Sequence, residues 1–423
     1  MFAFCLEKQI ELLLSQSITS FINYFHHVTF YVSNALQSSF WYCCNFGFER
    51  FAVRKSKNFS EIAVRNGSII LVFKCALLPD DLQIGKELLI HGDFIKDVSF
   101  VVDDIDAVLE AASKYNHQVL RSPKLLKDEC GSLRLATIQG SAGGIVHTLV
   151  QNIDYTGLFL LALSPLKISG YAAHYRQRRF LKHGLRESYE QMKVYKFLKQ
   201  PKSITRELRQ TICLAELDHV VEGHPEDTLE HVVDWYNRIL EMSRFWSIDD
   251  KQIHTQYSAL RAALVGNAHR NVKMTLVEPV TTKDGKGRRG QVQEFIDYHG
   301  GPGIQHIAFK VDDITTVVHK MRERGVEFLD IPESYYNQLE LRLADSKIEV
   351  LENLQKIRKL KILIDFDNNG YLLQIFTKPM QDRPTLFVEV IQRHNYDGFG
   401  AGNFKALFAA VELEQKKREG LYS

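Results

Sequence analysis

Gly300-Gly301-Pro302-Gly303-Ile304-Gln305-His306-Ile307-Ala308-Phe309-Lys310-Val311-Asp312-Asp313 is the stretch on which the prediction of the fold depends. A glycine and proline turn leads into residues that alternate between two faces, with Ile304, His306 and Ala308 on one face, as in a β-strand. A single histidine in an apolar strand is more often a hydrogen-bonded core residue than a ligand. The stretch alone therefore predicts a strand and leaves the role of His306 open.

An internal repeat gives this strand a counterpart. Gly92–Ile105 aligns with Gly301–Ile314 without a gap, and a helix-like segment follows both copies. Further paired segments are Phe25–Val28 with Leu217–Val220, and Val146–Gln151 with Phe387–Gln392. Self-similarity of this kind predicts two related halves, each a mixture of strands and helices.

Aligning the halves locates the candidate chemistry. The second half has His219, His306 and Glu389 on three separate strands, where the first half has His27, Asp97 and Thr148. Two imidazoles and one carboxylate form the facial triad of non-haem Fe(II) oxygenases, which leaves other coordination positions open. Zinc uses the same residue types, but the sequence has no H-E-x-x-H run. Ligands on three strands favour an open octahedral site.

Length and composition limit the other possibilities. The chain has 423 residues, of which 45% are hydrophobic and 25% charged, with a net charge of +2. We expect two or three globular domains and no nucleic-acid partner. All six cysteines precede residue 214 without a C-x-x-C motif, so reduced thiols and a cytoplasmic location are expected. Because no apolar run reaches 18 residues, no membrane span is expected.

Local patterns predict further elements. Strands are predicted at Phe25–Tyr31, Ser68–Lys74 and Gln291–Tyr298, a hairpin at Ile362–Phe366 and Leu372–Phe376, and helices at Ala35–Cys44, Thr228–Leu240 and Lys405–Arg418. Asn403 is predicted to cap the last helix. We call Gly398–Phe404 the flap, because its three glycines and two phenylalanines suit either a hinged lid or an ordinary loop.

Long motifs in the chain resemble the 4-hydroxyphenylpyruvate dioxygenase family. They are Leu217–Val220, Gln305–Ala308, Leu372–Pro379, Asp382–Arg393 and Gly398–Phe404, and the likeness covers most of residues 21–155 and 212–415. The resemblance implies an α+β vicinal-oxygen-chelate (glyoxalase/bleomycin-resistance/dioxygenase) fold of two homologous domains, each made of paired βαβββ modules. The implied division is an extension at 1–22, a domain without a metal site at 23–155, a linker with a basic insertion at 156–211, and the catalytic domain at 212–423.

The same resemblance implies the activity. Fe(II) in the open barrel of the C-terminal domain would be held by His219, His306 and Glu389, and 4-hydroxyphenylpyruvate with O₂ would yield homogentisate and CO₂ in tyrosine and phenylalanine breakdown. A cytoplasmic homodimer is expected. The implied substrate-binding residues are Gln291, Gln305, Gln374, Phe376, Phe387, Phe399, Asn403 and Phe404. Amides can donate to keto and phenol oxygens, and aromatic faces suit a planar ring, although simple core packing is the alternative for each phenylalanine.

Two positions depart from the family pattern. Ala262 stands where the family usually has serine, and Val277 where it usually has asparagine. The basic segment at 171–210 also replaces a shorter family linker. A weakened paralogue that binds metal as a sensor, and a hydroxymandelate synthase-type enzyme, therefore stay as alternatives. Identification of the product separates all three.

Overall fold

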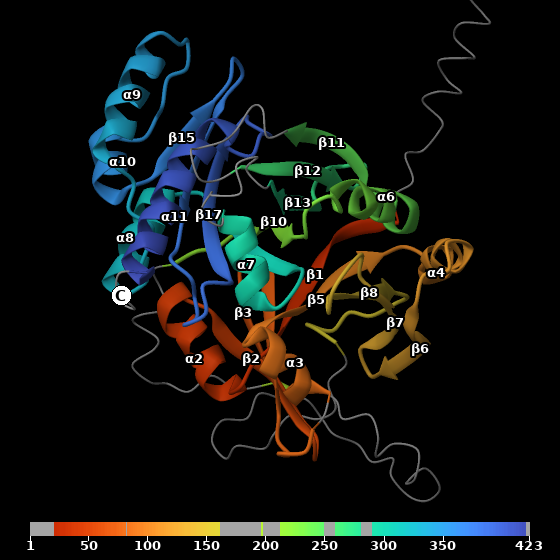
Figure 1. Cartoon of the computed structure of the whole chain (residues 1–423). Helices are drawn as coiled ribbons and strands as arrows, with labels where there is room; N and C mark the ends of the chain where they lie inside the picture. The colour runs from red at the N-terminus through yellow and green to blue at the C-terminus, as the bar shows by residue number, and fades with distance from the viewer. Residues whose placement is uncertain are drawn as a thin grey trace, which may run out of the picture.

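The computed structural model describes residues 21–81, 83–160, 196–197, 212–248, 259–280 and 290–419. The described strands form two curved sheets (Figure 1). The sheet of the first half has nine strands, and the sheet of the second half has eight. All of the predicted extension but its last two residues lies outside the described residues. So does the predicted basic segment, except for residues 196–197.

The first half consists of two βαβββ modules. Their elements are β1 (Ile22–Tyr31), α2 (Ala35–Phe46), β2 (Glu49–Lys55), β3 (Phe59–Asn66), β4 (Ile69–Ala76), α3 (Ile84–His91), β5 (Phe94–Val102), α4 (Ile105–Lys114), β6 (Val119–Asp128), β7 (Gly131–Gln139) and β8 (Val146–Asn152). A two-residue strand, β9 (Lys196–Phe197), extends the edge beside β2. The strand order is β6-β7-β8-β5-β1-β4-β3-β2-β9, with β1 and β5 at the centre.

The second half repeats this plan. Its elements are β10 (Glu216–Gly223), α6 (Leu229–Leu240), β11 (Ser243–Ile248), β12 (Leu260–Gly266), β13 (Lys273–Pro279), α7 (Gln291–His299), β14 (Gly303–Lys310), α8 (Ile314–Glu323), α9 (Glu333–Ala344), α10 (Leu354–Leu360), β15 (Leu363–Phe366), β16 (Tyr371–Phe376), β17 (Phe387–His394), η1 (Ala401–Asn403) and α11 (Phe404–Glu419). The order β11-β12-β13-β10-β14-β17-β16-β15 matches the first sheet read from β2 to β6, and β9 has no counterpart among the described residues. Helices α9 and α10 are additions before β15, and α11 runs beside β17 (Figure 1).

Strand register confirms the repeat alignment. The β1/β5 pairing has the same offset as the β10/β14 pairing, and the β5/β8 pairing has the same offset as the β14/β17 pairing. The positions aligned by these registers are His27 with His219, Asp97 with His306, and Thr148 with Glu389. Because hydrogen-bonded register fixes which side chains share a level of the sheet, the first half contains a true structural counterpart of the candidate metal centre.

A β-bulge interrupts β14, so the prediction that Ile304 and His306 share one face was wrong. Against β10, His306 pairs with Val221 and Ile304 pairs with Glu222, so Gln305 is an extra residue on its strand. A bulge of this kind shifts the facing of the residues before it. Gln305 therefore shares the cavity side with His306, whereas Ile304 turns into the hydrophobic core.

The prediction of a strand at Gln291–Tyr298 was wrong, because this segment is helix α7. Its buried residues Val292, Phe295 and His299 recur every three or four positions, which is a helical period. The helix ends at Gly300, whose φ of 76° is the left-handed conformation that glycine adopts most easily. The predicted hairpin of β15 and β16, by contrast, is confirmed.

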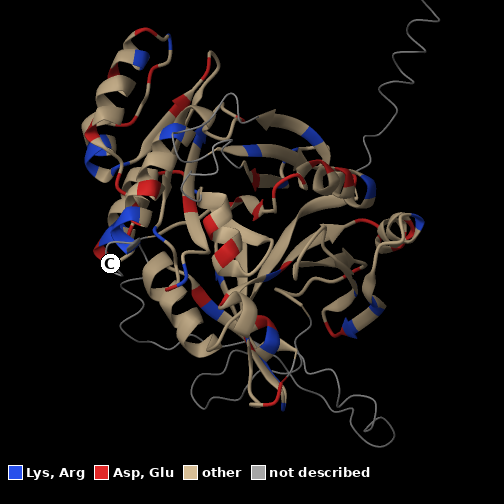
Figure 2. Cartoon of the chain, in the orientation of Figure 1, with Lys and Arg blue, Asp and Glu red and all other residues tan. Residues whose placement is uncertain are grey.

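The two halves share one hydrophobic core. Phe46 and Phe48 of the first half pack edge-on against Phe309 of β14, with ring centroids 6.0 and 5.8 Å apart. In Figure 2, the positions of Lys and Arg are interspersed with those of Asp and Glu along the described chain. Within the described residues, none of the helices has the length and apolar character that a membrane crossing requires.

Candidate metal centre

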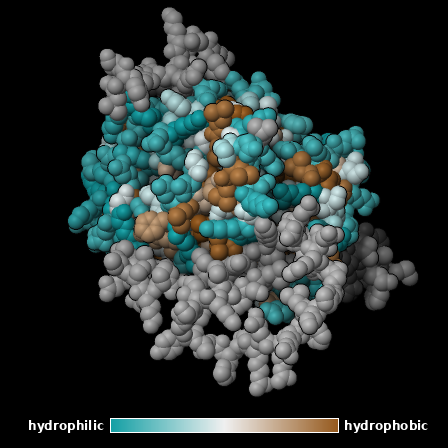
Figure 3. All heavy atoms as spheres, turned by 90° about the horizontal axis from the view of Figure 1, so that it is seen from below, coloured by the Kyte–Doolittle hydropathy of each residue, from teal (hydrophilic) through white to brown (hydrophobic). Residues whose placement is uncertain are grey.

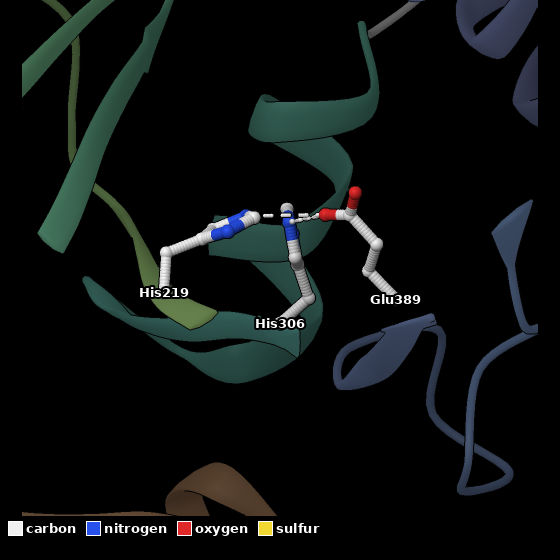
Figure 4. Close-up of side chains that lie close together, drawn as sticks. All are labelled: His219, His306 and Glu389. Atoms are coloured by element: carbon white, nitrogen blue, oxygen red, sulfur yellow. Dashed lines mark ion pairs between the residues drawn. The ribbon is translucent and has the colours of Figure 1, made fainter. Parts of the chain in front are cut away.

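Three neighbouring strands of the second sheet bring the predicted ligands together. His219 comes from β10, His306 from β14 and Glu389 from β17, and their side chains point toward one another (Figure 4). Ala308 pairs with both His219 and Glu389, so these two ligands lie at one level on either side of β14. In the described part of the chain, this is the only group of His, Cys, Asp or Glu found close enough to hold a metal ion.

The spacing of the donor atoms fits a single ion. Glu389 Oε2 lies 3.1 Å from His219 Nε2 and 3.5 Å from His306 Nε2, and all three donor atoms lie within 4.8 Å of one another. Adjacent ligands of an octahedral ion with bonds of about 2.1 Å are about 3 Å apart. Three protein ligands on one face would leave the remaining coordination positions open.

Electrostatics at the triad favour a bound cation. Burial opposes charge on His219, but the carboxylates of Glu389 and Asp218 outweigh it and raise the pKa of this imidazole. Burial lowers the pKa of His306, and Glu389 offsets this only in part. Burial would raise the pKa of Glu389, but the two histidines outweigh it and lower the value. The shift favours the ionised form of Glu389, and a divalent cation at this point would supply the positive charge beside it.

A second bulge orients His219. The β10/β14 register passes from Leu217 to His219, so Asp218 is an extra residue and lies on the same side as the ligand. His219 Nδ1 donates a hydrogen bond to Asp218 Oδ2 at 2.8 Å. Because this bond holds the proton on Nδ1, it leaves the Nε2 lone pair free for a metal.

Arg393 connects this orienting carboxylate to the flap. Its Nε and Nη2 donate to the two oxygens of Asp218 at 2.8 and 2.7 Å. Its Nη1 donates to the carbonyl oxygens of Tyr396 and Gly398 at 3.0 and 2.5 Å. Sequence reasoning missed the roles of Asp218 and Arg393. The sequence signal that could have found them is position: Asp218 directly precedes the ligand His219, and Arg393 ends the motif that contains the ligand Glu389.

Most of the predicted substrate-binding residues line a cavity of about 50 Å³ against the triad. They are Gln291, Gln305, Phe376, Phe387, Phe399 and Phe404, joined by Leu407 and Phe408 of α11. The ring of Phe387 stacks on His306 with centroids 4.5 Å apart, and Phe399 lies edge-on to His219 at 5.0 Å. The cavity wall is therefore mainly aromatic, with two amides.

Gln374 and Asn403 lie outside this lining. Gln374 is fully buried, neither of its amide atoms has a hydrogen-bond partner among the described residues, and Gly400 of the flap lies directly over it. Asn403 stands before α11, but its Oδ1 accepts a hydrogen bond from Tyr335 Oη at 2.7 Å. The predicted helix cap is thus not the contact that its side chain makes, and its Nδ2 has no partner within the described chain.

The two departures from the family pattern are neighbours. Ala262 on β12 pairs with Val277 on β13, and both are buried in one apolar cluster. Val277 lines the cavity, whereas Ala262 lies behind the lining. Neither side chain offers a hydrogen bond to a substrate.

Helix α11 closes the cavity against α7. Gln415 Nε2 and Arg418 Nη2 of α11 donate to the carboxylate of Glu294 on α7, at 3.0 Å and at 2.7 and 2.8 Å. Pockets for drug-sized ligands usually enclose about 300–1,000 Å³. The cavity of about 50 Å³ is much smaller, so a ligand of that size would enter only if the flap and α11 moved.

Comparisons with known proteins agree with this geometry. The sequence model of the Glyoxalase/Bleomycin resistance protein/Dioxygenase superfamily matches residues 216–347. The chain is 43% identical over 402 residues to 4-hydroxyphenylpyruvate dioxygenase of Caenorhabditis elegans, covering 94% of this chain and 93% of that protein. It is 42% identical over 406 residues to the Danio rerio enzyme, covering 95% and 92%. A solved mutant of 4-hydroxymandelate synthase from Streptomyces coelicolor aligns with a TM-score of 0.73 and 29% identity over 93% of this chain and 99% of that one.

Proposed function

Because the chain belongs to the 4-hydroxyphenylpyruvate dioxygenase family, we propose that it is an Fe(II)-dependent dioxygenase in tyrosine and phenylalanine breakdown. It converts 4-hydroxyphenylpyruvate and O₂ to homogentisate and CO₂. The observation that carries the proposal is the convergence of His219, His306 and Glu389 on one point of the second sheet. The reaction balances because the CO₂ contains the substrate carboxyl group, while the two atoms of O₂ enter the new carboxylate and the ring.

The donor set supports iron as the cofactor. Two imidazoles and one carboxylate are the ligands of non-haem Fe(II) oxygenases, and the donor spacing of 3.1–3.5 Å around Glu389 fits one octahedral ion. When bound, Fe(II) would accept an α-keto carboxylate as a chelating ligand and supply electrons to O₂. His219, His306 and Glu389 would hold it, and Asp218 would keep His219 in the coordinating tautomer.

The cavity residues position the substrate. The amides of Gln291 and Gln305 can donate to substrate oxygens, and Phe376, Phe387 and Phe399 offer faces for the phenol ring. Gln374, whose amide has no partner in the described residues, would turn to the substrate when the flap moves. Closure of α11 over the bound substrate would exclude water from the reacting atoms.

A second candidate is the hydroxymandelate synthase type, which the alignment with the Streptomyces coelicolor structure favours specifically. Such an enzyme would oxidise the side chain of the same substrate instead of its ring. A weakened paralogue is the third candidate, supported by the apolar Ala262 and Val277 pair at the cavity wall. The identity of 43% and 42% to the dioxygenases, against 29% to the synthase, favours the first reading.

The remaining expectations concern location and assembly. We propose a cytoplasmic homodimer. The free thiols of the described cysteines support a reducing compartment. Apolar residues gather on the face seen from below in Figure 3. The exposed apolar side chains of the described residues include Leu36 and Phe40 of α2 and Leu89 of α3, which is 80% exposed. Burial of such a patch against a second copy would stabilise a dimer.

Product identification tests the proposal. Purified protein loaded with Fe(II) is incubated in air with 4-hydroxyphenylpyruvate, and the acids formed are separated by chromatography and identified from their fragmentation spectra. Fragmentation is needed because homogentisate and 4-hydroxymandelate are isomers of equal mass. Homogentisate is the expected product. The mandelate would establish the second candidate, and unchanged substrate with iron bound would establish the third.

A further inference from the structure

The counterpart of the metal centre in the first half encloses a much larger cavity. It has a volume of about 420 Å³, whereas the cavity beside the iron ligands has about 50 Å³. Its wall includes His27, Asp97 and Thr148, the residues aligned with the metal triad. We call it the first-half cavity. Its volume lies within the range of about 300–1,000 Å³ that is usual for small-molecule sites.

Charged side chains stand on this wall where the second half has none. In the first half, Glu61 of β3 pairs with Lys74 of β4. In the second half, Ala262 of β12 pairs with Val277 of β13. The strand register aligns these two pairs with each other, Glu61 with Ala262 and Lys74 with Val277. The second half shows that the fold accepts an apolar pair at these positions. A buried ion pair seldom stabilises a protein more than such an apolar pair does. The fold therefore does not require the charges of Glu61, which is only 2% exposed, and Lys74.

Cations outnumber anions among the described residues of this wall. Lys74 Nζ lies 3.3 Å from Glu61, and Arg54 pairs with the same carboxylate. Lys96 Nζ is paired with Glu87 at 2.5 Å. The lining groups are the cations Arg54, Lys74, Lys96 and Arg121 against the anions Glu61, Glu87 and Asp97.

The state of Asp97 increases this excess. Burial raises the pKa of Asp97, which hydrogen bonds from Thr148 only partly counter, so its neutral form is favoured relative to an exposed carboxyl. The ammonium groups of Lys74 and Lys96 lie 5.6 and 5.8 Å from the centre of the same Tyr31 ring. Both ammonium groups line the same cavity. Hydroxyl and amide groups complete the wall: Thr29, Tyr31, Thr137, Thr148, Gln83 and Gln139.

We propose that the first-half cavity is a second ligand site, which binds a small organic carboxylate. The carboxylate group accepts charge-assisted hydrogen bonds from Lys74 and Lys96 beside Tyr31, and the hydroxyl and amide groups hold the polar body of the ligand. The site is separate from the metal centre and does not depend on the function proposed above. Glu61 competes with the ligand for Arg54 and Lys74, which tunes the affinity.

Calorimetric titration of succinate into the purified full-length chain loaded with Fe(II), under nitrogen, tests this inference. Saturable binding is expected. Lys74→Met should weaken it at least about tenfold, because a charge-assisted contact is lost. Glu61→Gln should strengthen it several-fold, because the competing anion is removed. These opposite signs distinguish a contact with the ligand from general damage to the fold. Lys310→Met is the matched control, since Lys310 pairs with Glu216 on the other sheet at 2.7 Å, and it should bind succinate normally.

Three results would overturn the proposal. One is the absence of saturable succinate binding to the unsubstituted chain. Another is equal affinity in Lys74→Met and Glu61→Gln, combined with loss of binding in His219→Ala, which would place succinate at the metal centre. The third is binding of inorganic phosphate as strong as that of succinate, with the same response to both substitutions, which would define a general anion site. Neutral succinamide should not bind.

Discussion

Substitution of Asp218 by asparagine perturbs the metal centre through one buried carboxylate. Asp218 is 5% exposed and accepts hydrogen bonds from His219 Nδ1 and from two guanidinium nitrogens of Arg393. An asparagine of the same size has one accepting oxygen and one donating NH₂ group. If its oxygen faces Arg393, its NH₂ group faces His219 Nδ1. The ring would then hold its proton on Nε2, the nitrogen that should bind the metal.

The expected magnitude has two parts. Loss of a group that orients a metal-bound histidine usually costs about 10–100-fold in metal affinity, or about 1.4–2.7 kcal/mol. Removal of the counter-charge of a buried guanidinium costs about 3–5 kcal/mol of folding stability. We expect about 3 kcal/mol for Asp218→Asn, because the asparagine oxygen still accepts one bond from Arg393.

Two assays separate these effects. Competition with a coloured chelator measures Fe(II) affinity, and unfolding in urea without metal measures stability. Asp106→Asn is the control, because Arg134 also binds Asp106 with two nitrogens, at 2.9 and 2.8 Å, but at an exposed site in the first half. It should lose little stability and no metal affinity, because an exposed ion pair contributes little. If Asp218→Asn bound Fe(II) within about twofold of the unsubstituted chain, Asp218 would not orient His219.

Four other changes give distinct results. Phe404→Ala should keep its metal but consume more O₂ per homogentisate formed, because the ring that it removes lines the cavity. An oxygen electrode combined with a product assay measures this ratio, and an unchanged ratio would contradict the prediction. Ala262→Ser combined with Val277→Asn should raise kcat/KM about tenfold to a hundredfold, because an asparagine at the cavity wall with a serine beside it would restore about 1–3 kcal/mol of substrate hydrogen bonding, and an unchanged value would show that position 277 does not contact substrate. His27→Ala, in the first half, should leave the iron content measured by elemental analysis unaltered, and loss of iron would contradict the assignment of the site. Burial lowers the pKa of His299 from 6.5 to about 4, so as the pH falls the unfolded chain is protonated at this residue before the folded chain, and up to about 3 kcal/mol of folding stability is lost between pH 6.5 and 4. Urea unfolding across this range should show a smaller loss of stability in His299→Gln.

The sequence was sufficient to predict that the three candidate metal ligands lie together. His219, His306 and Glu389 lie far apart along the chain, but the repeat aligns their strands, and the register of the sheet then brings them to one level. The hairpin of β15 and β16 was equally predictable, because its Asn-Gly turn is a local signal. Features determined by repetition or by local turn chemistry were thus accessible without a structure.

Features that depend on one extra residue in a strand were not accessible. The bulges at Asp218 and Gln305 turn these side chains toward the site, but strict alternation predicts the opposite facing. The pairing of Asp218 with Arg393 joins residues 175 positions apart, which no periodic pattern connects. Helix α7 was mistaken for a strand because Gln291 begins a short segment in which a period of two and a period of 3.6 compete.

Turnover under isotopically labelled O₂ tests the proposed dioxygenase reaction. The chain loaded with Fe(II) is given 4-hydroxyphenylpyruvate in an atmosphere of labelled O₂, and the product and CO₂ are analysed by mass spectrometry. We expect homogentisate with two labelled oxygen atoms, one in the new carboxylate and one on the ring, together with unlabelled CO₂. A product labelled on its side-chain carbon instead of its ring, or no labelled product from a chain whose His219, His306 and Glu389 hold iron, would contradict it.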